Sequence, residues 1–268
     1  MDEHLTNPRR DRAGATLAHA LVLATNRVAA PLKEQTAISL RARLPVRGRP
    51  VLAWVLDALR EASRIDSVVA VGPRSLAEEM GFPVGVRWVE EAETPAESVR
   101  RGLRGLGLST PVVVIPADLA LLTPELIDDL IASFPLGVDV GCPLIRVKEF
   151  TRAFPTLPQV TMNFRDGRFV GGRVVVAKPQ AVVMNYGLLQ RAWRRPRWPE
   201  AAIGMLGMQT ALLYSLRLLS ARQVAARATH RLMAPCAVLP DAPPELAFTL
   251  DTPEHFRLAQ ERQVAAPR

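Results

Sequence analysis

The first half of the chain alternates short apolar runs with amphipathic stretches, and this alternation limits the folds that are open to it. Residues 19–23 form an apolar run after a polar leader, and residues 66–71 read DSVVAV. Between them, residues 49–63 repeat apolar side chains at helical spacing, with Pro50 in the first turn. A strand, a helix and a second strand in this order predict a βαβ unit with a parallel pair.

The same alternation continues to residue 133. We expect strands at 86–89 and 111–115 and helices near 76–80, 94–106 and 123–133. The pattern predicts an α/β fold, a three-layer sandwich with a mostly parallel central sheet. In such folds ligands bind beyond the carboxyl ends of the strands.

The second half is less regular, and Asp166–Gly167 is its clearest turn signal. We expect strands near 138–142, 174–177, Ala237 and Phe248, a hairpin through Phe164 and Arg173, and helices near Lys148, at 188–193, at 201–231 and at 252–264. No linker or repeat forces a boundary. We therefore predict a flexible leader over 1–17 and one domain over 18–268, with a helical insertion at about 180–232.

Composition excludes several classes of protein. With 49% hydrophobic and 22% charged residues in 268, the chain is of globular type. Cys142 and Cys236 have no metal-site or disulfide spacing, and no signal peptide or membrane span is visible, so we expect a cytoplasmic protein. The net charge is +8, but aromatics make up only 5% and are not interleaved with the arginines. We expect no nucleic-acid partner.

Two aspartates are candidates for binding a divalent cation. Asp118 follows the apolar strand at 111–115, and Asp251 follows the apolar run near Phe248 and precedes Thr252. Two carboxylates at strand ends suit Mg²⁺, which takes one or two of them together with substrate phosphates. The alternatives are a turn aspartate at Asp118 and a helix N-cap at Asp251. His255, on the last predicted helix, is expected to be exposed.

Five segments resemble one family in the same order along the chain. They read LPVRGRPVLAWVLDAL (44–59), ESVRRGL (97–103), PADLALLTPE (116–125), FRDGRFVGGRVVVAKP (164–179) and LDTPEHF (250–256). Together they are similar to the MobA-like NTP transferases, which include molybdenum-cofactor and sugar-phosphate nucleotidyltransferases. The resemblance implies a Rossmann-like nucleotidyltransferase fold of GT-A type. No P-loop, GxGxxG or GxSxG motif points to another class.

The resemblance also implies a reaction and a set of site residues. An acceptor phosphate would attack the α-phosphate of a nucleoside triphosphate and release pyrophosphate, with Mg²⁺ held by Asp118 and Asp251. Ser98 would contact the nucleotide, and Gly171 and Gly172 would lie beneath a phosphorylated small-molecule acceptor.

The chain departs from the family where a glycine-rich turn binds the triphosphate. Ala24, Thr25 and Asn26 stand in place of glycines, and the β-branched Thr25 should not adopt positive φ. Arg41 lies nearest to the place of the family's lysine and is the candidate cation at the reacting phosphates. Arg27 and Lys33 are further candidates for phosphate contacts, with solvated loop cations as the alternative.

Three functions stay open at this point. They are an active nucleotidyltransferase, a non-catalytic binding or regulatory protein on the same scaffold, and a nucleotide-sugar-dependent glycosyltransferase. The apolar stretch at 203–219 is interpreted as a buried helix or a dimer face, with an interfacial helix that touches a membrane as the less favoured alternative. The oligomeric state is not predicted.

Overall fold

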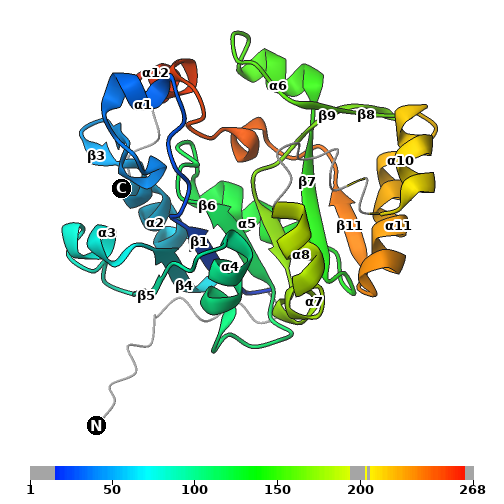
Figure 1. The fold of residues 1–268 in the computed structure, drawn as a ribbon, viewed down its shortest axis with the longest axis horizontal. Helices are drawn as coiled ribbons and strands as arrows, with labels where there is room; N and C mark the ends of the chain where they lie inside the picture. Colours follow the sequence, from blue (N-terminus) through cyan, green and yellow to red (C-terminus); the bar gives the residue numbers. More distant parts are fainter. Residues whose placement is uncertain (1–15, 194–202, 204–205, 263–268) are drawn as a thin grey trace.

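The computed structural model describes residues 16–193, 203 and 206–262. One half of its central sheet is parallel and has the order β5-β4-β1-β6 (Figure 1). These strands span β1 Ala18–Leu23, β4 Ile65–Gly72, β5 Val86–Glu90 and β6 Val112–Pro116. The predicted apolar runs therefore pair as expected, and their carboxyl ends share one edge of the sheet.

The other half of the sheet is mixed. Strand β10 (Val175–Ala177) is antiparallel to both β6 and β7 (Val140–Arg146), so β6 and β7 run in the same direction. Strand β11 (Cys236–Leu239) is parallel to β7, and the hairpin β8 (Thr161–Phe164) and β9 (Gly167–Gly171) pairs with the end of β7. The predicted α/β fold with a mostly parallel sheet is confirmed.

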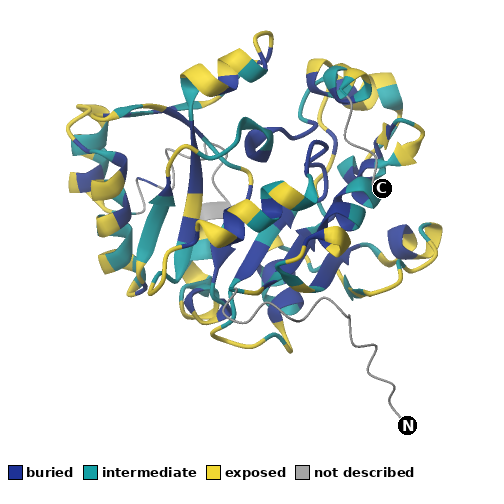
Figure 2. Ribbon diagram, turned by 180° about the vertical axis from the view of Figure 1, so that it is seen from behind, coloured by how far each residue is buried: buried dark blue, intermediate teal, exposed yellow. Residues whose placement is uncertain are grey.

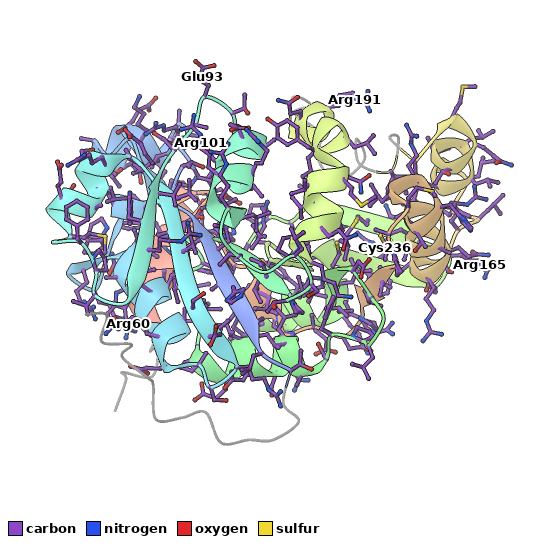
Figure 3. All side chains as sticks on the ribbon, turned by 90° about the horizontal axis from the view of Figure 1, so that it is seen from below. Arg60, Glu93, Arg101, Arg165, Arg191 and Cys236 are labelled. Atoms are coloured by element: carbon purple, nitrogen blue, oxygen red, sulfur yellow. The ribbon has the colours of Figure 1, made fainter. Side chains whose placement is uncertain are left out.

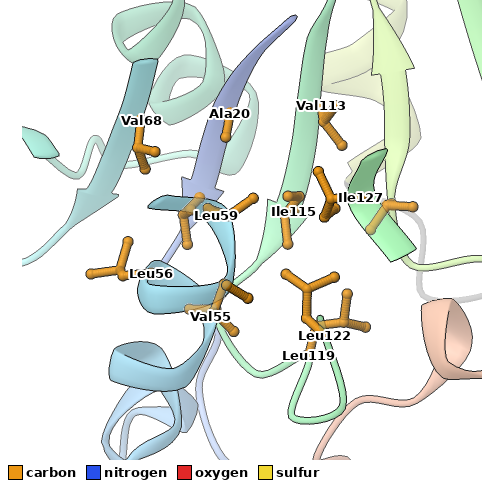
Figure 4. Packing of buried hydrophobic residues seen from close by; sticks show 14 of the residues in the cluster. Ala20, Val55, Leu56, Leu59, Val68, Val113, Ile115, Leu119, Leu122 and Ile127 are labelled. Carbon is orange, nitrogen blue, oxygen red and sulfur yellow. The ribbon is translucent and has the colours of Figure 1, made fainter. Parts of the chain in front are cut away.

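Helices cover both faces of the sheet, which gives three layers. Helices α2 (Val51–Glu61) and α5 (Pro124–Ala132) pack together on one face, and α4 (Pro95–Leu103) and α8 (Tyr186–Trp193) pack on the other. Figure 4 shows the main core, where Val55, Leu56 and Leu59 of α2 meet side chains of β1, β4, β6 and α5. Burial is concentrated in the sheet, while the outer helices keep exposed faces (Figure 2).

Apart from α11, the remaining elements are short, and most of them lie at the carboxyl edge or in the second half of the chain. They are α1 Leu32–Thr36, η1 Arg41–Arg43, β2 Pro45–Val46, β3 Arg49–Pro50, α3 Arg74–Glu79, α6 Val147–Ala153, α7 Pro179–Met184, α10 Met208–Ser215, α11 Ala221–Leu232, η2 Pro244–Ala247 and α12 Pro253–Glu261. No helix in the described ranges is long and apolar enough to cross a membrane.

Two element predictions were wrong. Phe248 is not in a strand, because the 3-10 helix η2 ends beside it and the preceding prolines cannot donate to a sheet ladder. The apolar run instead buries Phe248 against Phe154, with ring centroids 5.0 Å apart.

The stretch at 201–231 is not one helix. Arg217 turns the chain with a φ of 58°, and Ser220 then starts α11 with a capping box to Gln223. Helices α7 to α11 lie between β10 and β11, where the insertion was predicted, but part of that segment and residues 1–15 of the predicted leader lie outside the described residues. The domain limits stay a prediction.

Gly102 sets how closely α4 can approach the sheet. A methyl group at its Cα would lie 2.4 Å from Leu21 Cδ1 and 2.8 Å from Val71 Cγ2, both on buried strands. Such contacts require a shift of the helix or of two core side chains.

We therefore expect Gly102→Ala to lower the free energy of unfolding by about 1–3 kcal/mol in denaturant titrations. Gly187, on α8, is the matched control, because nothing lies within 4 Å of the place that an added methyl group would take there. Gly187→Ala should leave the stability unchanged or raise it slightly. Equal losses in the two variants would contradict this account of the α4 contact.

Candidate functional site

Asp118 lies at the carboxyl edge of the sheet, directly beyond β6. The Ala117 amide donates a hydrogen bond to the Leu23 carbonyl, which extends the β1–β6 pairing almost to the aspartate. Asp118 is fully buried, and its Oδ1 atom has no hydrogen-bond partner among the described residues. A buried carboxylate oxygen without a partner is costly, which makes this atom a candidate ligand for a cation.

Asp251 reaches the same edge from the C-terminal part of the chain. Its Oδ2 atom accepts a hydrogen bond from the Thr249 hydroxyl at 3.1 Å. The next residue, Thr252, caps α12 by accepting a hydrogen bond from the His255 amide. The N-cap alternative for Asp251 was therefore wrong, and its carboxylate is left to face Asp118.

One guanidinium joins the two carboxylates. Arg41 Nη1 lies 3.1 Å from Asp118 Oδ2 and also donates to Asp251 Oδ1. The three side chains come from residues 41, 118 and 251, which only the fold brings together. Sequence analysis singled out all three, and the structure places them in one cluster, which we call the Arg41 cluster.

The loop after β1 holds Arg41 in position. The backbone amide of Arg41 donates a hydrogen bond to the Asn26 carbonyl at 2.9 Å. Arg41 Nε donates another to the Arg27 carbonyl at 3.0 Å. Residues 24–27 all have negative φ, since none of them is among the described residues with positive φ. The loop therefore avoids the strain that Thr25 would meet in a glycine-type turn, and its carbonyls anchor the arginine.

Arg173 is a member of the site that sequence reasoning missed. Its Nη2 atom lies 2.8 Å from Asp251 Oδ2, and its backbone amide bonds the Leu246 carbonyl. The signal was its position directly after Gly171–Gly172. The sequence of a basic segment does not show which acid an arginine pairs with, so the ion pair with Asp251 could be found only in the structure.

The two carboxyl groups have pKa values shifted in opposite directions. Burial raises the pKa of Asp118, and the charge of Asp251 adds to this, while Arg41 opposes it. Burial also acts on Asp251, but Arg173 and Arg41 together outweigh it and lower the pKa of that carboxyl. Asp251 is thus held as a carboxylate, whereas Asp118 depends on a neighbouring cation to stay charged.

The loop residues predicted for nucleotide binding differ in exposure. Ala24 is buried and its amide bonds the Val71 carbonyl, whereas Asn26 and Lys33 are exposed. Arg27 is exposed and forms a surface ion pair with Glu91 at 2.9 Å. The roles of Ala24, Thr25, Asn26, Arg27 and Lys33 stay predictions.

Ser98, Gly171 and Gly172 have structural contacts of their own. Ser98 is fully buried, and its hydroxyl accepts a hydrogen bond from the Ala92 amide at 2.9 Å. A methyl group on Gly172 would meet Pro143 Cβ at 2.9 Å, so the chain passes close to β7 there. Gly171 and Gly172 directly precede Arg173, whose side chain reaches Asp251. Their contacts with a substrate stay predictions, as does that of Ser98.

His255 was expected to be exposed, and this was wrong. Its side chain is buried against Phe248, and Nδ1 lies 2.8 Å from the Thr252 hydroxyl. Burial lowers the pKa of His255, so the neutral ring is favoured. The helical position alone could not show that η2 brings an aromatic ring against it.

The described side chains alone supply only some of the ligands that a divalent cation such as Mg²⁺ needs. In the described chain no group of three or more His, Cys, Asp or Glu side chains could hold a metal. Two carboxylates, one of them with an unpartnered oxygen, match a cation that takes its other ligands from substrate phosphates and water. Arg41 lies between these carboxylates, so a metal shared by both would displace it.

Similarity to a known protein family agrees with this geometry. The model of the MobA-like NTP transferase domain matches residues 39–232, which is most of the chain. The chain belongs to this family. The match begins after the loop at 24–27 and ends before Asp251, so it includes Arg41 and Asp118 but leaves the altered loop and the second carboxylate outside. The predicted resemblance, and with it membership of an enzyme family, is confirmed.

Curated relatives are similar over shorter stretches. A 2-C-methyl-D-erythritol 4-phosphate cytidylyltransferase of Gloeobacter violaceus is 38% identical over 79 residues, which cover 27% of this chain and 34% of that protein. The enzyme of the same name from Synechococcus elongatus is 32% identical over 132 residues, covering 46% of this chain and 53% of that protein. The chain thus spans about a third to a half of the length of these relatives.

Solved structures share the fold over nearly the whole chain. A hypothetical transferase from Thermus thermophilus has a TM-score of 0.76 at 24% identity and covers 90% of this chain and 99% of its own. A 4-diphosphocytidyl-2C-methyl-D-erythritol synthase from Anaerococcus prevotii has a TM-score of 0.54 at 14% identity, with 92% and 95% covered. At these identities the likeness shows the fold alone.

Removal of Arg41 should leave two carboxylates close together with one of them buried. We expect Arg41→Ala to lower the free energy of unfolding by about 3 kcal/mol at pH 7. Asp118, without its cation, would then have a pKa further above the unfolded value of about 3.9, so the variant should lose stability as pH rises from about 4. Denaturant titrations at several pH values measure both effects.

Arg27→Ala is the matched control, because its side chain is 61% exposed and its ion pair lies at the surface. It should cost less than about 1 kcal/mol and show no such pH trend. A loss for Arg41→Ala that is as small as the control, or one that grows toward acid pH, would contradict the buried-charge account.

Proposed function

We propose that the chain transfers a nucleotidyl group from a nucleoside triphosphate, with CTP as the first candidate, to a phosphorylated small molecule. The observation that carries this proposal is the Arg41 cluster, in which a buried carboxylate with an unpartnered oxygen faces a second carboxylate and two arginines. Membership of the family supports the reaction type, and the names of the two curated relatives support CTP and a phosphorylated acceptor.

In the proposed reaction an oxygen of the acceptor phosphate forms a bond to the α-phosphorus of the nucleotide. The bond from that phosphorus to the bridging oxygen of the β-phosphate breaks, and pyrophosphate leaves with the bonding electrons. Such a transfer depends on positioning and on neutralised charge rather than on a covalent enzyme intermediate. The reaction therefore needs positive charge held in a fixed position, and the Arg41 cluster at the carboxyl edge of the sheet is suited to provide it.

Asp118 and Asp251 are the residues proposed to hold Mg²⁺. When bound, this ion would neutralise phosphate charge and act as a template for the reacting groups. Arg41, on leaving the carboxylates, would carry its positive charge to the phosphates. Arg173 would keep its contact with Asp251 and so hold that carboxylate ionised.

A cationic cavity offers a place for the acceptor's own anionic group. It has a volume of about 630 Å³ and is lined by Arg146, Val147, Lys148, Thr151 and Arg168. Arg146 ends β7, which runs in the same direction as β6, so the cavity opens at the carboxyl edge that also carries Asp118. Arg146 pairs with Asp241 at 2.6 Å and Lys148 with Glu149 at 3.7 Å, so Arg168 leaves the lining with a net positive charge. This charge would favour a phosphorylated acceptor over a neutral one.

Thermal unfolding with each of the four nucleoside triphosphates, and with UDP-glucose and GDP-mannose, tests the proposal without knowledge of the acceptor. Ligand at 100 times its dissociation constant stabilises the folded state by about 2.7 kcal/mol. We expect CTP with Mg²⁺ to raise the midpoint by several degrees, with a smaller effect when Mg²⁺ is left out.

Asp118→Asn should abolish this rise, whereas Asp139→Asn should keep it. Asp139 is the matched control, since its carboxylate pairs with Lys178 outside the Arg41 cluster at 2.7 Å. A rise with a nucleotide sugar alone would replace the proposal with a glycosyltransferase. No rise with any ligand would favour a non-catalytic scaffold.

A further inference from the structure

Residues 167–240 form the most basic part of the chain. Between Gly167 and Pro240 the sequence holds eleven arginines and lysines and a single acid, Glu200, so this stretch carries +10. The whole chain carries +8, and the remaining residues therefore sum to −2. Ordinary surfaces mix both signs of charge, so a segregation of this size indicates an anionic partner.

The same stretch carries an exposed apolar stripe at α10. Met208 and Leu212 are four residues apart, which places them on one face of the helix, and Leu216 caps its C-terminal end. Their exposed fractions are 88%, 58% and 58%, and Leu218, after the helix, is 52% exposed. For 203–219 the prediction was a buried helix or a dimer face. The buried helix is wrong for these described side chains, which are exposed to solvent, and the dimer face stays a prediction.

Exposed arginines surround the end of this stripe. Arg217 lies between Leu216 and Leu218, and the backbone amide of Arg165 bonds the Leu219 carbonyl at 2.8 Å. Figure 3 shows Arg165 at the outer edge of the molecule beside α10 and α11. Arg222, on α11, is exposed as well, and the described part of the chain offers no ion pair to any of the three arginines.

We propose that the α10 stripe, defined as Met208, Leu212, Leu216 and Leu218 with Arg165, Arg217 and Arg222, docks the protein on an anionic lipid surface. Helix α10 lies at the edge of the molecule, where protruding side chains can enter a bilayer interface (Figures 1 and 2). Aliphatic side chains insert at the boundary of headgroups and acyl chains, and arginines bind the phosphates above them.

Other occupants fit these features less well. A second copy of the chain would bring Arg165, Arg217 and Arg222 of two stripes face to face, which costs electrostatic energy. Nucleic acid would use the arginines, but it offers nothing to four exposed aliphatic side chains. A lipid surface uses both features at once, and it requires no membrane-spanning helix.

Co-sedimentation of the full chain with vesicles tests this proposal. Vesicles of equal parts phosphatidylglycerol and phosphatidylcholine should bind the protein at low ionic strength, and pure phosphatidylcholine vesicles should not. High salt should weaken the binding, because it screens the arginines. Arg217→Gln should lower partitioning about fivefold, the factor that corresponds to about 1 kcal/mol for one cation near an anionic surface.

Two pairs of variants test whether binding depends on the stripe or on any exposed leucine or arginine. Leu212→Ser should lower partitioning, whereas Leu136→Ser, at a leucine 94% exposed elsewhere, should not. Arg104→Gln, an exposed arginine on the other half of the molecule, is the control for Arg217→Gln. Unchanged thermal midpoints would show that all four variants fold.

Three results would overturn the proposal. The first is no binding to the anionic vesicles at low ionic strength. The second is binding that the control variants weaken as much as the stripe variants do. The third is dimerisation in size-exclusion chromatography that Leu212→Ser abolishes, since this would assign the stripe to a second copy of the chain. None of these measurements depends on nucleotide transfer, so the transferase proposal can fail without affecting this one.

Discussion

The site depends on one electrostatic arrangement, in which Arg41 lies between a fully buried carboxylate and a second, partly buried one. Burial raises the pKa of Asp118, and the charge of Arg41 opposes this shift and so favours the ionised carboxyl group. A bound metal ion would act on this carboxyl group in the same direction. Under the proposed function a metal ion would replace Arg41 between the carboxylates, and this exchange links the fold to the proposed chemistry.

The surrounding structure fixes the three charges from different directions. Parallel pairing of β1 and β6 brings Asp118 to the edge, the loop after β1 grips Arg41 with two carbonyls, and the start of α12 presents Asp251. The loop at 24–27, which has no glycine, anchors an arginine with two backbone carbonyls. Under the proposed function the charge of that arginine would compensate for the missing glycines at the phosphates.

Local patterns were enough for most of the framework. The apolar runs predicted the parallel strands, and the position of Asp118 just past one of them predicted its place at the edge. Contacts between distant segments could not be read in this way. Arg173 looked like one more arginine of a basic segment, and the apolar run before Asp251 looked like a strand. His255 was misjudged because its burial depends on η2, which packs Phe248 against the ring. In each case the deciding partner lies far away in the sequence or in an irregular segment.

Diffraction from crystals grown with CTP and Mn²⁺ would show whether a metal ion replaces Arg41 between Asp118 and Asp251. Mn²⁺ accepts the same oxygen ligands as Mg²⁺ and gives an anomalous signal that locates it. We predict an anomalous peak in contact with Asp118 and Asp251, with the Arg41 side chain moved from between them toward the phosphates. A peak away from both aspartates, or nucleotide bound while Arg41 still bridges them, would contradict the account.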